Sequence, residues 1–95
     1  MLRIDDFIWL PDIIEKIIVK HHVTPDEAEG IFFSRPTYRF VESGYTKGED
    51  IYSAMGQTDS GRYLIVFFIL KPHNAALILT ARDMDRKERR LYERR

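Results

Sequence analysis

The chain has 95 residues, of which 44% are hydrophobic and 13% aromatic, and its formal net charge at pH 7 is zero. We expect one folded domain spanning residues 1–95, because this length supports a single core and the apolar fraction is typical of globular proteins. The sequence contains no cysteine, which excludes disulfide bonds, thiolate zinc sites and cysteine nucleophiles.

The sequence lacks the features of an exported or membrane protein. Two acidic residues, Asp5 and Asp6, lie where a signal peptide needs positive charge. The longest apolar run, residues 63–70, is far shorter than the ~20 residues of a membrane-spanning helix. We therefore expect a cytoplasmic protein that does not enter a membrane.

Charge is unevenly distributed along the chain. Residues 1–60 contain six Lys or Arg against eleven Asp or Glu, whereas residues 61–95 contain nine against four. A basic segment of this kind either binds a polyanion or an acidic partner, or it is a solvated helix with balancing acids nearby. The charge pattern alone leaves both interpretations open.

The first third of the chain is predicted to be helical. Residues 7–9 are aromatic and β-branched, so they form either a short edge strand or an extended segment packed on the core. A first helix should begin at Pro11 and end near Lys20 or His21, because isoleucines recur along one of its faces. A second helix should follow Thr24, which opens a Thr-Pro-Asp-Glu sequence of the capping-box type.

From Pro36 onward the apolar pattern becomes that of β-strands. The third of four predicted strands should be central in the sheet, because its apolar residues do not alternate with polar ones. The predicted strands are residues 37–41, 51–56, 63–70 and 75–81. The predicted fold class is therefore α+β, with two N-terminal helices, a four-stranded antiparallel meander sheet and a C-terminal helix.

The C-terminal helix, expected from residue 83 or 85 to about residue 94, is strongly basic. Its apolar anchors are Met84, Leu91 and Tyr92. Arg86, Arg89 and Arg90 are spaced at i, i+3 and i+4, so they share a face that could line a phosphate backbone. Sheet tyrosines could stack bases beside them; the candidates are Tyr38, Tyr52 and Tyr63. The alternative is an exposed helix stabilised by its own neighbouring residues.

Two further features suggest proton transfer. Lys20, His21 and His22 follow one another at a helix C-terminus, where the helix dipole favours a protonated imidazole that could act at a phosphodiester. Alternatively, His21 caps the helix and His22 fills the turn. Glu49 precedes a strand and is either a base or a solubilising acid. The common metal, serine-triad and phosphate-loop motifs are absent from the sequence, so we expect no metal and no cofactor.

Taken in order, these residues resemble the BrnT family of bacterial toxins. The resemblance rests on Phe7-Ile8-Trp9, Lys20-His21, Val23–Ala28, Phe32, Glu49, Gly56, Gly61-Arg62, Thr80-Ala81-Arg82, Glu88-Arg89 and Tyr92. It implies a RelE-like ribonuclease fold and translation arrest by RNA cleavage. It also implies neutralisation by a BrnA-like antitoxin with a DNA-binding part, and it allows a dimer within the toxin–antitoxin complex.

The resemblance also implies roles for individual residues. The implied catalytic residues are Lys20, His21, Glu49 and Arg82. The residues that we expect to bind RNA, all on the C-terminal helix, are Arg86, Arg89, Arg90 and Tyr92. In the implied metal-independent mechanism, His21 or Glu49 takes the 2′-hydroxyl proton, and Arg82, helped by Lys20, stabilises the dianionic phosphorane. If Glu49 is the base, His21 protonates the leaving 5′-oxygen.

The chain departs from the family pattern at three positions. Ile51 and Leu77 stand where the family often has arginine, and His22 replaces a usual glycine. Losing two cations from a phosphate site favours a second interpretation, a toxin-fold protein without activity that only binds its antitoxin. A third interpretation is a plain nucleic-acid-binding module, for which RNA binding would depend steeply on salt without cleavage.

Overall fold

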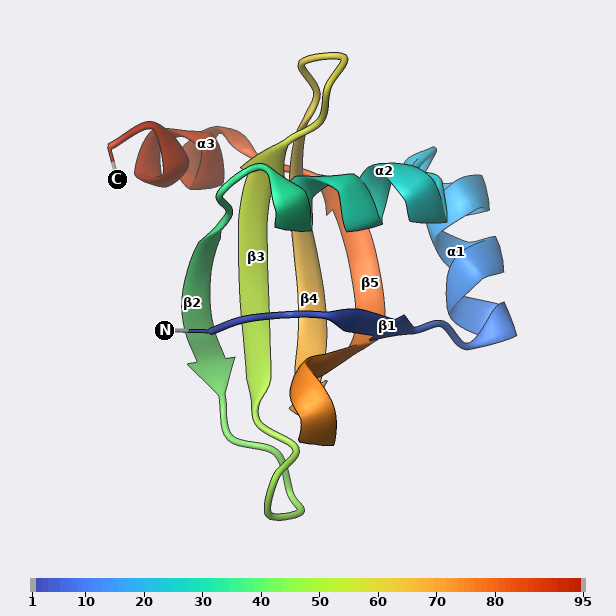
Figure 1. The fold of residues 1–95 in the computed structure, drawn as a ribbon. Helices are drawn as coiled ribbons and strands as arrows, with labels where there is room; N and C mark the ends of the chain where they lie inside the picture. Colours follow the sequence, from blue (N-terminus) through green and yellow to red (C-terminus); the bar gives the residue numbers. More distant parts are fainter. Residues whose placement is uncertain (1, 95) are drawn as a thin grey trace.

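The computed structural model describes residues 2–94, in which three helices pack on a five-stranded mixed sheet (Figure 1). In chain order the elements are β1 (Asp6–Ile8), α1 (Pro11–His21), α2 (Pro25–Gly30), β2 (Thr37–Glu42), β3 (Ile51–Gln57), β4 (Tyr63–Lys71), β5 (Ala75–Asp83) and α3 (Arg86–Glu93). Two 3₁₀ turns are η1 (Ile31–Phe33) and η2 (Pro72–Asn74). The predicted α+β class, the three helices and the four long strands are confirmed.

The sheet differs from the predicted meander by one strand. Its order is β1-β5-β4-β3-β2, and β2 to β5 form the expected antiparallel meander. β1 is added at the edge and runs parallel to β5, with Asp6 opposite Ala75 and Ile8 opposite Leu77. The prediction of a four-stranded antiparallel sheet is therefore wrong. A three-residue strand is too short to show an alternation of apolar and polar residues, and its partner β5 lies near the other end of the chain.

α1 and α2 begin where their cap residues predict, and α1 also ends where we expected. α1 starts at Pro11 and ends at His21, and the following cap residue, His22, adopts the left-handed conformation (φ 56°) and donates its backbone N–H to Ile18 O at 3.1 Å. The capping box of α2 is present, since the Glu27 N–H donates to Thr24 Oγ1 (3.1 Å) and the Thr24 N–H donates to Glu27 Oε1 (3.0 Å). These contacts fix the turn between α1 and α2 at one end of the sheet.

The main hydrophobic core lies between the sheet and these two helices. Phe68 of β4 is fully buried at its centre. The Phe68 ring lies 5.6 Å from the Phe32 ring, 6.1 Å from Tyr38 and 6.0 Å from Tyr52, measured between centroids. The N-terminal segment crosses this same face of the sheet in Figure 1 and adds Ile4 to the core.

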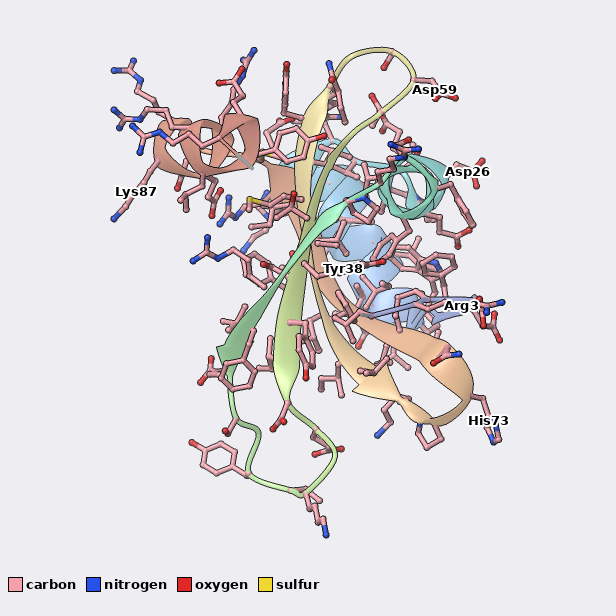
Figure 2. All side chains as sticks on the ribbon, turned by 60° about the vertical axis from the view of Figure 1, so that its left-hand side comes forward. Arg3, Asp26, Tyr38, Asp59, His73 and Lys87 are labelled. Carbon is pink, nitrogen blue, oxygen red and sulfur yellow. The ribbon has the colours of Figure 1, made fainter. Side chains whose placement is uncertain are left out.

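α3 packs on the opposite face of the sheet, as Figure 2 shows. Tyr92 is buried against Met55 and Ile65, with Met84 beside them. Leu91, which we expected to anchor the helix, is 40% exposed, so that prediction is wrong. Met84 and Tyr92 do serve as anchors. Within residues 2–94, α3 is the only helix on this face, so no described helix covers the part of the face beyond α3, although Ser53 there is buried among its neighbours.

Candidate active site

The sheet face beside α3 presents three cross-strand rows of side chains, because residues directly opposite each other point to the same side. The first row is Thr37, Met55, Ile65 and Arg82; the second is Arg39, Ser53, Phe67 and Thr80; the third is Glu42, Ile51, Ile69 and Leu77. α3 covers the apolar part of the first row. The second and third rows extend beyond α3 toward the end of the sheet at which Lys71 lies.

Arg82 lies at the end of the first row, and α3 fixes its orientation. Its Nη1 and Nη2 atoms donate to Glu88 Oε1 (2.8 Å) and Oε2 (2.9 Å), and Nη1 also donates to Asp83 O (3.1 Å). The guanidinium carbon lies 5.5 Å from the centroid of the Phe67 ring. One third of the Arg82 side chain is exposed.

Arg82 retains free hydrogen-bond donors. A guanidinium has five N–H groups, and within the described residues the Nε–H and one Nη2–H of Arg82 have no partner. These two groups form the side-on edge of the guanidinium, which binds a phosphate or carboxylate through two parallel hydrogen bonds. Arg82 is therefore held in position and can still bind an anion.

The three arginines that we expected on one face of α3 are divided between two faces. Arg89 lies against the sheet, with its guanidinium carbon 3.9 Å from the centroid of the Tyr63 ring and its Nε atom 3.8 Å from Glu93 Oε2. Arg86 and Arg90 are exposed and make no ion pair within the described residues. Figure 2 shows the neighbouring Lys87 pointing away from the sheet. A cationic stripe on the outer face of α3 consists of Arg86, Lys87, Arg90 and Arg94.

Tyr92 and the sheet tyrosines differ from their expected roles. Tyr92 is 5% exposed and packs on Tyr63 at 5.9 Å between ring centroids, so it supports α3 from within. Tyr38 and Tyr52 belong to the core under α1 and α2, and burial raises the pKa of Tyr38. Of the three sheet tyrosines, Tyr63 alone shares a face with Arg82, and Arg89 covers its ring.

Arg62 is a residue whose role the sequence did not reveal. Its Nε and Nη2 atoms donate to Asp83 Oδ1 (2.7 Å) and Oδ2 (3.1 Å). Nη2 also donates to His21 O (3.0 Å), while Nη1 donates to His22 O (2.6 Å) and lies 3.4 Å from Glu27 Oε1. All five N–H groups are thus engaged, and Arg62 joins the end of α1 to α2, β4 and β5. The Gly61-Arg62 dipeptide belongs to the family resemblance, but the residues that the Arg62 side chain contacts lie 21 or more positions away in the sequence.

The structure brings His21 to the same end of the sheet as Arg82 but on the other side of β5. His21 is half-buried, and through Arg62 it is linked to Asp83, the residue after Arg82. Lys20 is exposed and lines a shallow hollow on the outer face of α1 together with Lys16. Within residues 2–94, neither Lys20 nor His21 makes a hydrogen bond or ion pair with Arg82.

Glu49 lies at the other end of the sheet. It belongs to the loop between β2 and β3, at the bottom of Figure 1, and its Oε2 atom is 3.5 Å from Lys71 Nζ. Arg82 is opposite Ile65, six residues before Lys71 on β4, which corresponds to roughly 20 Å along the strand. The structure therefore does not bring Glu49 and Arg82 together at one phosphodiester.

Ion pairs shift the pKa values of three carboxyl groups around β5. The hydrogen bond from Arg62 lowers the pKa of Asp83, and the hydrogen bonds from Arg82 lower the pKa of Glu88. For Glu27, the hydrogen bond from the Thr24 backbone is the main cause of a lowered pKa, and Arg62 adds to it. All three carboxyl groups are therefore held in their charged form in the folded protein.

We expect the free energy of unfolding to decrease in acid. Since the folded pKa values of Glu27, Asp83 and Glu88 lie below the ordinary 4.5 for Glu and 3.8 for Asp, the unfolded chain binds protons first. The contribution of these three groups to the free energy of unfolding is complete above their ordinary pKa values and is lost as the pH falls through their lowered pKa values. Urea unfolding from about pH 3 to about pH 7 measures this loss.

Asparagine variants provide the comparison for this measurement. Asp83→Asn should weaken the dependence of the free energy of unfolding on pH. Asp59→Asn, in the hairpin between β3 and β4 and without an ion pair within the described residues, should not. Equal stability of the unmodified chain at both ends of the pH range would contradict the expectation.

No three histidine, aspartate or glutamate side chains of residues 2–94 come together in a group that could hold a metal ion. None of the helices in this part of the chain is long and apolar enough to cross a membrane.

Comparison with known proteins gives one family. A family model described as "Ribonuclease toxin, BrnT, of type II toxin-antitoxin system" matches residues 9–88. The matched region begins directly after β1 and ends within α3, so it includes Arg62, Arg82 and Glu88. No curated protein matches the chain.

Proposed function

Because this chain belongs to the BrnT family of ribonuclease toxins of type II toxin–antitoxin systems, we propose that it is an endoribonuclease that arrests translation by cleaving RNA. The single domain of residues 1–95, with a RelE-like fold, acts in the cytoplasm. A BrnA-like antitoxin neutralises it, and the toxin forms a dimer within that complex. The observation that carries the proposal is Arg82, which α3 holds in place with an anion-binding edge free.

Arg82 acts on the phosphate in this proposal. Its Nε–H and Nη2–H groups bind the non-bridging oxygens and stabilise the extra negative charge of the phosphorane that forms when the 2′-oxygen attacks phosphorus. Donors that are already oriented give this stabilisation without reorganising during the reaction. The ion pair with Glu88 and the contact with Phe67 supply that orientation.

The RNA backbone lies along the cationic stripe of α3. Arg86 and Arg90 are exposed, so they are available to neutralise phosphates and their contribution depends on salt. Lys20, next to His21, adds positive charge at the same end of the sheet. Tyr92 and Arg89 act indirectly, by holding α3 against Tyr63 and thereby keeping Glu88 beside Arg82. No step of this mechanism requires a metal ion.

A second function is favoured by the third row of the open sheet face. Ile51 and Leu77 both lie opposite Ile69, so the two positions where the family often carries arginine are next to one another across β4. They form an apolar row where an arginine pair would bind RNA. A chain with this row would bind its antitoxin, or nucleic acid, without cleaving RNA.

The experiment that tests the proposal is RNA cleavage by the purified protein in excess EDTA. We expect cleavage products with 2′,3′-cyclic phosphate and 5′-hydroxyl ends, because the 2′-oxygen is the nucleophile. RNA of the same sequence with 2′-O-methyl groups is the matched control and should remain intact. If the folded protein leaves both RNAs intact but still binds its antitoxin, the second function replaces the first.

A further inference from the structure

We infer that Glu88 is the catalytic base, so that Arg82 and Glu88 form one catalytic unit beneath the first turn of α3. The inference rests on the proposed function and identifies the proton acceptor that this function needs. Neither His21 nor Glu49 contacts Arg82 within the described residues, and Glu49 lies at the far end of β4.

The Glu88 carboxylate is fixed from two sides. Its two oxygens accept from Arg82 Nη1 and Nη2, and Oε1 also accepts from the Asp85 N–H at 2.9 Å. The Asp85 carboxylate in turn accepts from the Glu88 N–H at 2.7 Å, which completes a capping box at the start of α3. With 19% of its side chain exposed, Glu88 is held in place and still reachable from solvent.

The free edge of Arg82 places a bound phosphate beside this carboxylate. Nη2 donates one hydrogen to Glu88 Oε2 and has its other hydrogen on the free edge. A phosphate that binds Nε–H and Nη2–H therefore lies next to Oε2, because the guanidinium is planar. The 2′-hydroxyl adjacent to that phosphate is then within reach of Glu88.

The other carboxylates around Arg82 have different partners. Asp83 is engaged by Arg62 on the opposite side of β5, and Asp85 caps the helix. The groups that act on the Glu88 carboxylate are Arg82 from β5 and Asp85 at the cap of α3. Among the described residues, Glu88 is therefore the carboxylate positioned to take a proton at Arg82.

Phosphate binding also makes Glu88 a stronger base. In the free protein, the hydrogen bonds from Arg82 lower the pKa of Glu88. A bound phosphate shares the charge of Arg82 and brings negative charge close to Glu88, and both changes raise the pKa of that carboxyl. Arg82 thus keeps Glu88 deprotonated while the site is empty, and Glu88 gains proton affinity when RNA occupies the site.

The reaction balances with this single base. The 2′-O–H bond breaks and its proton passes to Glu88, the bond from the 2′-oxygen to phosphorus forms, and the bond from phosphorus to the 5′-oxygen breaks. The leaving 5′-oxygen takes a proton from solvent, and Glu88 returns its proton to solvent. No proton is consumed overall, and the products carry 2′,3′-cyclic phosphate and 5′-hydroxyl ends.

Glu88→Gln tests this role, because glutamine keeps the size and a hydrogen-bond acceptor for Asp85 and Arg82 but accepts no proton at neutral pH. We expect the single-turnover cleavage rate to fall by about 10²-fold or more. Binding of a 2′-O-methyl RNA should change by less than about threefold, since that binding uses Arg82 and the cationic stripe. The matched control is Glu93→Gln, which removes the exposed partner of Arg89 on the same helix and should cleave at the wild-type rate.

The pH profile distinguishes a base from a structural residue. Wild type should lose activity in acid as Glu88 becomes protonated, and Glu88→Asp, which retains a carboxylate, should recover part of the activity lost in Glu88→Gln. This profile also tests the assignment if Glu88→Gln folds poorly: a wild-type rate that stays constant through the acid range would overturn it. Cleavage by a folded Glu88→Gln at the wild-type rate overturns the assignment of Glu88 and leaves the proposed function intact. No cleavage by the wild type in EDTA overturns both.

Discussion

Replacing Arg82 with alanine is expected to lower the rate of RNA cleavage by about 10²–10³-fold, the range found when one oriented donor to a developing oxyanion is removed. Two N–H groups that face the phosphate are lost together with their positive charge. Arg82→Lys should recover only a small part of the rate, because an ammonium group cannot bind Glu88 and a phosphate along two separate edges.

Single-turnover kinetics in EDTA measure this effect. The matched control is Arg39→Ala, which removes an exposed arginine from the second row of the same sheet face and should change the rate by less than about threefold. Removing Arg82 also leaves Glu88 without its cationic partner, so the acid side of the pH profile should move to higher pH. A folded Arg82→Ala variant with the wild-type rate would remove Arg82 from the mechanism.

Replacing Phe68 with alanine is expected to reduce the free energy of unfolding by about 3–5 kcal/mol. Phe68 is fully buried in the central strand, and its ring contacts Phe32, Tyr38 and Tyr52. The variant loses the burial of the ring and leaves a cavity that three other rings cannot fill without moving. Since the whole stability of a small domain is about 5–15 kcal/mol, this single change removes a large fraction of it.

Urea titration followed by circular dichroism checks this value. Phe40→Ala provides the comparison, because Phe40 lies on the edge strand and is 57% exposed, so its loss should cost less than about 1 kcal/mol. A cost for Phe68→Ala as small as that of Phe40→Ala would show that the aromatic cluster does not stabilise the fold.

The parts of the fold that the sequence predicted are those with local causes. Pro11 begins α1, the Thr24 capping box begins α2, and the change of period after Pro36 marks the start of the strands. A short edge strand at residues 7–9 was one of two alternatives, and its place beside β5 could not be predicted because it depends on pairing between distant parts of the chain. Leu91 and Tyr92 are neighbours on a short helix, and the packing of α3 on Met55 and Ile65 decides which of them is buried.

The candidate site was predictable to a smaller extent. The sequence places Arg82 at the end of a strand. Because side chains alternate along that strand, Arg82 contacts Glu88 on one face of the sheet, whereas Asp83 contacts Arg62 on the other face. Which face carries α3 is a tertiary property and was not visible in the sequence. The separation of Glu49 from Arg82 does follow from the predicted meander, because β3 and β5 run in the same direction, with Glu49 before the start of β3 and Arg82 near the end of β5. Glu88 appeared in the sequence as part of a helix and of the family resemblance, but nothing there showed that it orients Arg82.

The pairing of β1 with β5 joins the two ends of the chain and belongs to the late steps of folding. Asn74 Nδ2 donates to Asp5 Oδ2 across 69 residues of sequence, and Asp6 lies opposite Ala75. Such non-local contacts form late, because a long loop must close before they contribute. A ribosome that has released only the N-terminal helices and β2 to β4 has produced neither the strand that receives β1 nor the Arg82–Glu88 pair. The complete sheet and the Arg82–Glu88 ion pair therefore form only after β5 and α3 have been synthesised.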